Sequence, residues 1–555
     1  MTWHFYNKEI SQKSIGELLE MLEAGTLTSE ELVWAYTERI AALDNDPEGP
    51  QLHAVRELNP DAFQIARERD WERKTGKCRG PLHGIPILLK DSIDTGDKTR
   101  TTCSSAAMRN HRADEDAFIV KKLREAGAII LGKNYCTEFY GYSALGAPNG
   151  YSSLLGGSPR NPFSFRGACE KEETQARGPE YGDGLRQEAP EYVWIGKGEE
   201  GHIIPGGSSG GSAVSVAADM TAAAIGTETA GSIFEPAYVN GVVGYKPTVG
   251  LTSRTGILPI MMCQDAAGPI TRTVEDAARI ADVIIARDEK DPDTVRAEIF
   301  EEGSFLDGLE EASLKGCRLG IVREAYYEGI GGLSKPAGAG IENGPAAPDL
   351  TAKSPTAADL TEKALKMLAQ AGAEIIEIQD FLPAQILAEP EKHSERMDWE
   401  VMNRAFKVRF DEYLARQKDL PFHSLKELLA WNEAHPENIP LGQSYLEKVE
   451  ALGDLPLQEM TFVKSRMNDL EICGERGVWG AMEKYGLDAL ILPGLDAQGI
   501  AATAGNPTIT IPAGFSKQTG PVGITLVGEL MGDRELLRIA RACEKALPKR
   551  PAPVF

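Results

Sequence analysis

Apolar residues recur along this chain in two patterns, one with helical spacing and one as short unbroken runs. Between residues 14 and 44 the spacing predicts two helices, and Thr28 followed by Glu31 has the form of a capping box. The apolar run 85–89 and the sequence AIILG at 128–132 predict buried strands, with a helical pattern between them. Helices that alternate with buried strands predict an α/β fold.

The same alternation continues to the C-terminal end. Further strands are predicted by GVVGY (241–245), CRLGIV (317–322), AEIIEI (373–378), DALILP (488–493), PTITIPAGF (507–515) and VGITLVG (522–528). Further helices are predicted near 274–287, 356–372, 388–416, 445–485 and 533–546. Phe406, Phe410 and Tyr413 recur at helical spacing, which favours core packing over a ligand site.

Two segments depart from this alternation. Residues 166–204 are rich in charged residues with scattered Gly and Pro, and residues 328–356 are rich in Gly, Ala and Pro. We interpret both as surface excursions from a single domain that spans residues 1–555.

The stretch 206–232 reads GGSSGGSAVSVAADMTAAAIGTETAGS. Two glycine pairs bracket Ser208 and Ser209, and a second glycine-containing turn presents Ser232. The small residues between the turns predict a tightly packed helix. A flexible Gly/Ser linker is not followed by an apolar, Ala-rich helix, so the stretch favours catalysis over a linker.

Composition excludes several classes of function. The 555 residues carry a formal net charge of −24, which disfavours nucleic acid and anionic membrane surfaces as partners. The eight cysteines are scattered without a CxxC pair, which favours a reducing compartment. The N-terminal sequence lacks the apolar region of a secretory signal, and no run approaches the ~18 apolar residues of a membrane span. We therefore expect a cytoplasmic protein.

Known metal and cofactor motifs are absent from the sequence. It contains no HExxH, no phosphate-binding GxxxxGK[ST] and no GxGxxG after a strand. The histidines show no metal-ligand spacing, and His83 in the turn LHGIP fits a structural role better than a chemical one. These motifs therefore point to no metal or cofactor site.

Lys90 directly follows the apolar run 85–89, which places it at the end of a buried strand. A serine hydroxyl is a weak nucleophile until a base takes its proton. A free lysine has a pKa near ~10.4, and full burial can lower that pKa by up to ~3–5 units. Lys90 is therefore a candidate base, while Gly226 and Gly231 permit backbone N–H groups near Ser232 to converge in an oxyanion hole.

A second interpretation remains open on the residues alone. The sequence 206–210, GGSSG, matches the G-x-S-x-G nucleophile elbow of α/β-hydrolases, with His393, His423 and His435 downstream as possible bases. Such an elbow needs a strand that runs directly into the serine, and Pro205 argues against that strand.

Several long motifs, in order, resemble the amidase signature family. They are GPLHGIPILLKD (80–91), GKNYCTEF (132–139), GGSSGGSA (206–213), GTETAGSIFEPA (226–237), GVVGYKPTVGLTSRTGI (241–257), QDAAGPITRT (264–273), and the C-terminal GNPTITIPAGF and PVGITLVG. The TET form, with QDAAGP and SRTGI, is most similar to the peptide amidase and broad-specificity amidase branch. The resemblance implies one α/β/α domain with a central mixed, mostly parallel sheet covered by helices, and no cofactor.

The resemblance also implies a Ser–cisSer–Lys triad. Ser232 would be the nucleophile, Ser208 would follow a cis peptide bond and relay the proton, and Lys90 would be the final base. Backbone N–H groups would form the oxyanion hole, from Thr229, Ala230, Gly231 and Ser232. Ser209 would support the turn.

Departures from the family pattern concern the substrate. Many members have an arginine where this chain has Phe234, and the chain carries Glu228, Ala230 and Tyr135 at positions where other residues are usual. Tyr140 and Phe234 are candidates for lining the substrate pocket.

The implied activity is hydrolysis of a linear carboxamide through a seryl acyl-enzyme, by a monomer or a homodimer, with a small-molecule amide as substrate. An ammonia-producing amidotransferase subunit and a non-catalytic binding protein on the same fold are the alternatives.

Overall fold

The computed structural model describes residues 10–147, 150–154, 159–163, 203–323, 356–388, 400–454, 457, 459–494, 498–516 and 519–555. Within them the chain forms one mixed sheet of 11 strands, in the order β1-β3-β2-β4-β6-β5-β10-β11-β9-β7-β8. The strands are β1 (Val55–Leu58), β2 (Pro86–Lys90), β3 (Ile129–Asn134), β4 (Ala223–Glu228), β5 (Val243–Lys246), β6 (Ala266–Thr271), β7 (Arg318–Ile321), β8 (Glu374–Glu377), β9 (Ala489–Leu492), β10 (Thr508–Ser516) and β11 (Gly520–Val527).

Helices surround this sheet. They are α1 (Ile15–Glu23), α2 (Ser29–Ile40), α3 (Ala62–Lys74), α4 (Phe118–Glu125), α5 (Gly210–Ala217), α6 (Phe234–Asn240), α7 (Val274–Ile284), α8 (Ala357–Gln370), α9 (Leu382–Ala388), α10 (Glu400–Leu414), α11 (Leu425–Ala434), α12 (Ser444–Glu450), α13 (Met460–Leu470), α14 (Trp479–Tyr485), α15 (Gln498–Ala504) and α16 (Asp533–Ala546). The predicted capping box is confirmed, since Thr28 and Glu31 exchange hydrogen bonds at the start of α2. Among the described residues, no helix is long and apolar enough to cross a membrane.

The two faces of the sheet carry different helices. Gly244 of β5 faces α6, where an added Cβ would lie 2.6 Å from the Ala237 side chain. Its neighbours Val243 and Tyr245 point to the opposite face, because successive strand residues alternate. There they share a core cluster with Ala277 of α7 and with residues of α16. Helix α6 therefore covers one face, and α7 and α16 cover the other.

The strand directions correct one part of the prediction. The mixed sheet covered by helices is confirmed, but parallel pairing is confined to two groups, β3-β2-β4 and β9-β7-β8. The middle of the sheet and its β1 edge pair antiparallel. Short connections, such as the one between β10 and β11, can only join antiparallel neighbours. The described sheet is therefore not mostly parallel.

The predicted small-residue helix after Ser209 is only partly right. Helix α5 ends at Ala217, and Asp219 then adopts a left-handed φ of 62°. The following residues form strand β4, which pairs with β2 on one side and β6 on the other. Ala is a good helix former, but this double pairing in a buried sheet overrides that propensity.

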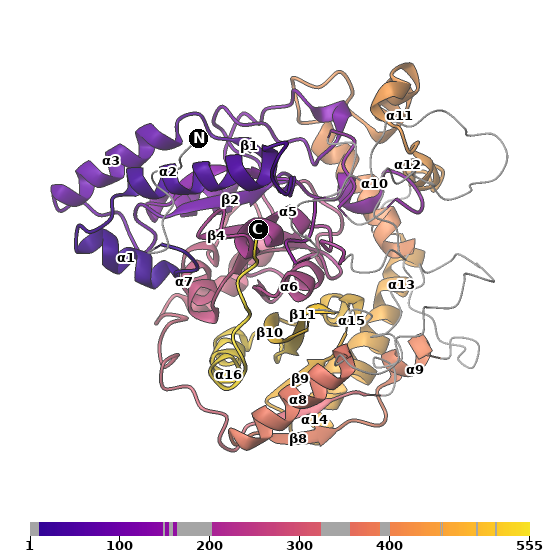
Figure 1. Cartoon of the computed structure of the whole chain (residues 1–555). Coiled ribbons are helices and arrows are strands. Elements are labelled where there is room, and N and C mark those ends of the chain that lie inside the picture. Colours follow the sequence, from indigo (N-terminus) through magenta and orange to yellow (C-terminus); the bar gives the residue numbers. More distant parts are fainter. Residues whose placement is uncertain are drawn as a thin grey trace.

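A group of helices, α10 to α13, lies at one side of the sheet (Figure 1). The aromatic residues at helical spacing are core residues there, as predicted: Phe406 stacks on Tyr142 with ring centroids 4.1 Å apart, and Phe410 meets the Phe139 ring at 5.3 Å. This packing joins the helical group to the segment that carries Tyr140. The predicted surface excursions lie outside the described residues, apart from a few residues at their ends.

Candidate functional site

Lys90 is the last residue of β2 and lies between β3 and β4 in the sheet. Its side chain is fully buried, because β2 is flanked by apolar strands on both sides. The amine donates one hydrogen bond to Ser208 Oγ over 2.7 Å and another to the Thr227 carbonyl over 3.0 Å. The structure therefore brings together the two side chains that the sequence implied as base and relay.

Ser208 lies in the loop before α5, and the peptide bond that precedes it is cis. Ser209 supports this turn, as the sequence implied, since its hydroxyl lies 3.2 Å from the carbonyl oxygen and 3.3 Å from the nitrogen of Thr227. The backbone N–H of Ser209 also donates to the Ser232 carbonyl over 3.2 Å. The two serine turns, far apart in sequence, therefore lie against each other.

Glu228, the last residue of β4, holds the turn that presents Ser232. One carboxylate oxygen accepts hydrogen bonds from the N–H groups of Ile233 and Phe234, over 2.7 and 2.9 Å. These N–H groups open helix α6, where a negative charge is stabilising. Gly231 has a φ of 98°, which favours glycine. The sequence indicated Glu228 only as a departure, because a residue six positions before the first helical residue lies outside the positions that mark a helix start.

Thr229 begins the predicted oxyanion loop and is held from two directions. Its hydroxyl donates to Asp265 Oδ1 over 2.5 Å, and its carbonyl accepts a hydrogen bond from the Gln264 side chain over 3.1 Å. The second oxygen of Asp265 accepts from the backbone N–H groups of Ile260 and Met261, each over 2.9 Å. Sequence reasoning missed the roles of Gln264 and Asp265, although both lie in the motif QDAAGP.

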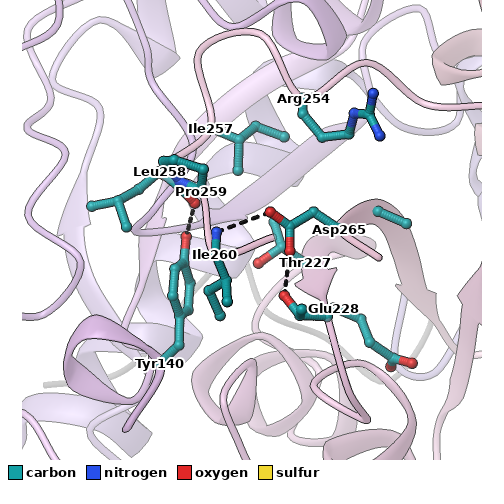
Figure 2. A pocket seen from close by; sticks show the side chains of 11 residues that line it. Tyr140, Thr227, Glu228, Arg254, Ile257, Leu258, Pro259, Ile260 and Asp265 are labelled. Atoms are coloured by element: carbon teal, nitrogen blue, oxygen red, sulfur yellow. Dashed lines mark hydrogen bonds between the residues drawn. The ribbon is translucent and has the colours of Figure 1, made fainter. Parts of the chain in front are cut away.

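A pocket lies beside this loop (Figure 2). Its lining consists of Tyr140, Thr227, Glu228, Thr229, Arg254, Ile257, Leu258, Pro259, Ile260, Asp265 and Ala266. Of the two residues predicted to line a pocket, Tyr140 is in this set. Phe234 is not: it packs with Tyr238 and Leu360 in a separate apolar cluster at the start of α6.

Burial lowers the pKa of Lys90 to about 8, because the ammonium loses its contact with water. Nearby groups raise the pKa of Lys90 and offset only part of the effect of burial. They are the thiols of Cys136 and Cys103 and the carboxylates of Glu228 and Asp265. A lysine of this pKa is partly neutral near neutral pH, as a general base must be.

A lowered pKa alone does not identify the base. Lys133 and Lys246 are also fully buried, and burial lowers the pKa of each to about 8. The Lys246 amine donates instead to the Pro247 carbonyl, and the Lys133 amine donates to the Ile93 carbonyl and the Thr101 hydroxyl. Lys90 differs from both because its amine reaches a hydroxyl on the Gly-rich serine turn.

The histidines of the described residues do not assemble a site of their own. His83 is a structural residue, as predicted: Nδ1 accepts from the Arg79 N–H over 3.1 Å, and Nε2 lies 2.9 Å from the Arg69 carbonyl. Of the possible bases for a hydrolase elbow, His423 is exposed and His435 stacks on Trp431. His393 lies outside the described residues.

The strand that a nucleophile elbow requires is also missing from this part of the described chain, since residues 203–207 belong to no strand. Within the described residues, no group of three or more His, Cys, Asp or Glu side chains is placed to hold a metal ion.

Comparison with known proteins gives a consistent picture. A family model described as Amidase matches residues 31–166 and 200–332. A probable amidase from Arabidopsis thaliana is 33% identical over 98% of this chain and 92% of its own length. A peptide amidase structure from Stenotrophomonas maltophilia is 33% identical, with a TM-score of 0.78, and the match covers 98% of this chain and 99% of that one. One chain of the glutamyl-tRNA(Gln) amidotransferase from Thermoanaerobacter pseudethanolicus is 29% identical over 97% of each protein.

Proposed function

Because this chain belongs to the amidase signature family, we propose that it hydrolyses linear carboxamides to a carboxylic acid and ammonia or an amine. Ser232 is the nucleophile, Ser208 the proton relay and Lys90 the final base. One observation carries this proposal. The buried Lys90 amine lies 2.7 Å from Ser208 Oγ, and the backbone N–H of the next residue, Ser209, donates a hydrogen bond to the Ser232 carbonyl.

The chemistry begins when Ser232 Oγ attacks the amide carbonyl carbon. Ser208 takes the proton of Ser232 and passes its own proton to neutral Lys90. The negative oxygen of the tetrahedral intermediate is stabilised by backbone N–H groups of residues 229–232. The proton then returns through Ser208 to the leaving nitrogen, the C–N bond breaks, and water releases the acid from the acyl-enzyme.

Peptide amides are the first substrates to test, because a peptide amidase is among the similar solved structures. The charges beside the oxyanion loop favour a substrate without a carboxylate. Arg254, the one arginine among the residues that line the pocket there, is already paired with Asp291 and Asp293.

The direct test is labelling with a fluorophosphonate, which reacts with an activated serine. We expect a single label at Ser232, and we expect Ser232→Ala to lose both the label and the release of ammonia from peptide, aromatic and aliphatic amides. Ser313→Ala, at an exposed serine on the loop before β7, is the matched control and should keep both. Undiminished turnover in Ser232→Ala would refute the proposal.

The alternatives give different results in the same assays. An amidotransferase subunit would act only on glutamine and co-purify with a partner chain, and the similarity to a glutamyl-tRNA(Gln) amidotransferase chain keeps this function as the second candidate. A binding protein would show no turnover on the whole amide panel. Its case is weaker because all three triad positions are occupied.

We further propose a cytoplasmic enzyme that takes a small-molecule amide and acts as a monomer or a homodimer. The free cysteines of the described chain support a reducing compartment. Fractionation of the source cells and light scattering of the purified protein test these two points.

A further inference from the structure

The amine of Lys90 faces an aromatic ring as well as a hydroxyl. Its nitrogen lies over the ring of Tyr140, 4.9 Å from the ring centroid. An ammonium group within about 6 Å of a ring centroid is attracted to the electron-rich face of the ring, and the attraction is stronger where water is excluded. Lys90 is fully buried, so this contact is of the stronger kind.

The Tyr140 ring is fixed in this position at both ends. At one end, the Tyr140 hydroxyl donates a hydrogen bond to the Leu258 carbonyl over 2.5 Å (Figure 2). At the other end, where the side chain joins the backbone, Phe139 and Tyr140 both adopt left-handed backbone conformations, with φ values of 45° and 62°. Non-glycine residues rarely adopt this conformation. The buried Phe139 ring packs against Phe410 and anchors this turn.

The other groups around Lys90 do not neutralise its charge by a direct ion pair. Its hydrogen bonds in the described structure go to a hydroxyl and a carbonyl, from Ser208 and Thr227. The carboxylates of Glu228 and Asp265 act from further away and are engaged by backbone N–H groups. The thiols of Cys103 and Cys136 complete the set of titratable neighbours.

We propose that Tyr140 is a positioning residue for Lys90: the face of its ring holds the ammonium in line with Ser208 and stabilises the protonated state. Burial by itself favours the neutral form of the amine. The Tyr140 ring acts against the effect of burial on the Lys90 amine. Tyr140 therefore sets the pH at which this amine loses its proton and becomes a base. This inference rests on the proposed function, in which Lys90 exchanges a proton with Ser208.

The test is the pH dependence of the fluorophosphonate labelling rate at Ser232 and of kcat/KM, measured in the full chain. Tyr140→Phe keeps the ring and loses only the hydroxyl, so its midpoint should match that of the native protein. Tyr140→Leu removes the ring, so the ammonium loses stabilisation and the midpoint should fall by about 0.4–1.5 pH units. Tyr485→Leu, on the surface helix α14, is the control and should not move the midpoint.

A second series separates the ring's electrostatics from its shape. Phenylalanine with one, two or three fluorines at position 140 weakens the electron-rich face while it changes the volume little, so the midpoint should fall stepwise with each fluorine. The role of Tyr140 is overturned if the midpoint of the pH profile stays fixed or rises in Tyr140→Leu. It is also overturned if that midpoint does not change with the number of fluorines. A native profile with no rise at all refutes Lys90 as base instead, so the two failures are distinguishable.

Discussion

The amine nitrogen of Lys90 lies 2.7 Å from the hydroxyl oxygen of Ser208, although 118 positions separate the two residues in the sequence. The contact arises because β2 ends at Lys90 beside strand β4, and the loop that carries Ser208 packs over the end of β4. The proposed base and the proposed relay are therefore both held in place by the sheet, so proton transfer between them would need little reorganisation.

This relationship predicts the pH dependence of the reaction. Lys90 acts as a base only when it is neutral, and burial lowers its pKa to about 8. We therefore expect kcat/KM to rise about tenfold per pH unit below about pH 8 and to level off above it. Lys90→Met, which keeps an unbranched chain up to the position of the amine but lacks the amine itself, should lower kcat/KM by at least about a hundredfold and remove the rise. A flat native profile from about pH 6 to about pH 10, with chemistry rate-limiting, would contradict this role.

The sequence predicted Lys90 and β2 well because a short apolar run followed by a lysine has few other structural explanations. It did not predict β4, because a strand of Ala, Gly and Thr has neither the alternation nor the β-branched residues that mark strands. Strand β4 is recognisable only through its neighbours, since it is paired on both sides. Most predicted elements of the described chain were found within a few residues of their expected bounds.

Sequence patterns also did not predict the hydrogen bond that holds the proposed oxyanion loop, for a related reason. Thr229 and Asp265 are 36 positions apart, and they meet because β4 and β6 pair antiparallel with Glu228 opposite Ala266. That register places the residue after β4 beside the residue before β6. Only knowledge of the pairing between two unpredicted strands would have brought them together.

The Thr229–Asp265 contact gives a prediction about kcat. Thr229→Val removes the donor hydroxyl with little change in shape, and Asp265→Asn removes the charge that also holds the N–H groups of Ile260 and Met261. Because the proposed oxyanion loop would act in the transition state, we expect each variant to lower kcat about tenfold with KM nearly unchanged.

The double variant is the decisive measurement for this contact. If the two side chains act through one hydrogen bond, the double variant should lose about as much as the worse single variant. Fully additive losses would mean that they act separately. Thr510→Val, at a buried hydroxyl pair between β10 and β11, is the control and should leave kcat unchanged.

Two adjacent glycines at the start of α5 make a matched pair for stability. A Cβ on Gly211 would lie 2.4 Å from the Tyr135 carbonyl and 2.6 Å from the Ala54 carbonyl, both backbone atoms. A Cβ on Gly210 would meet nothing nearer than 3.6 Å. In urea unfolding we expect Gly211→Ala to lose about 1–3 kcal/mol and reduce activity. Gly210→Ala should be neutral or stabilising, because Ala favours helix by up to about 1 kcal/mol over Gly.

The Gly211 comparison also reports on the serine turn. Gly211 donates its N–H to the Tyr135 carbonyl, so displacement there would move the loop that carries Ser208. Equal stability and equal labelling at Ser232 in both variants would show that the close packing has no consequence for the site.

Glu138 gives a prediction about stability and pH. It is buried two residues before Tyr140, and burial raises its pKa from 4.5 to about 7, although the Ser153 hydroxyl donates to it over 2.7 Å. At low pH the carboxyl is protonated in both the folded and the unfolded chain. As the pH rises from 4.5 to about 7 the unfolded chain gives up this proton first, so the contribution to the free energy of unfolding falls.

Glu138→Gln removes this penalty while keeping an oxygen for Ser153. At about pH 8 the variant should be more stable than the native protein by roughly 2–3 kcal/mol, and at about pH 5 the gain should be small. Glu72→Gln is the opposite control, because the Arg79 guanidinium lowers the pKa of Glu72 to about 2. Glu72→Gln should therefore lower the free energy of unfolding at both pH values. Urea unfolding measures both variants, and a Glu138→Gln gain of the same size at both pH values would contradict the buried-acid explanation.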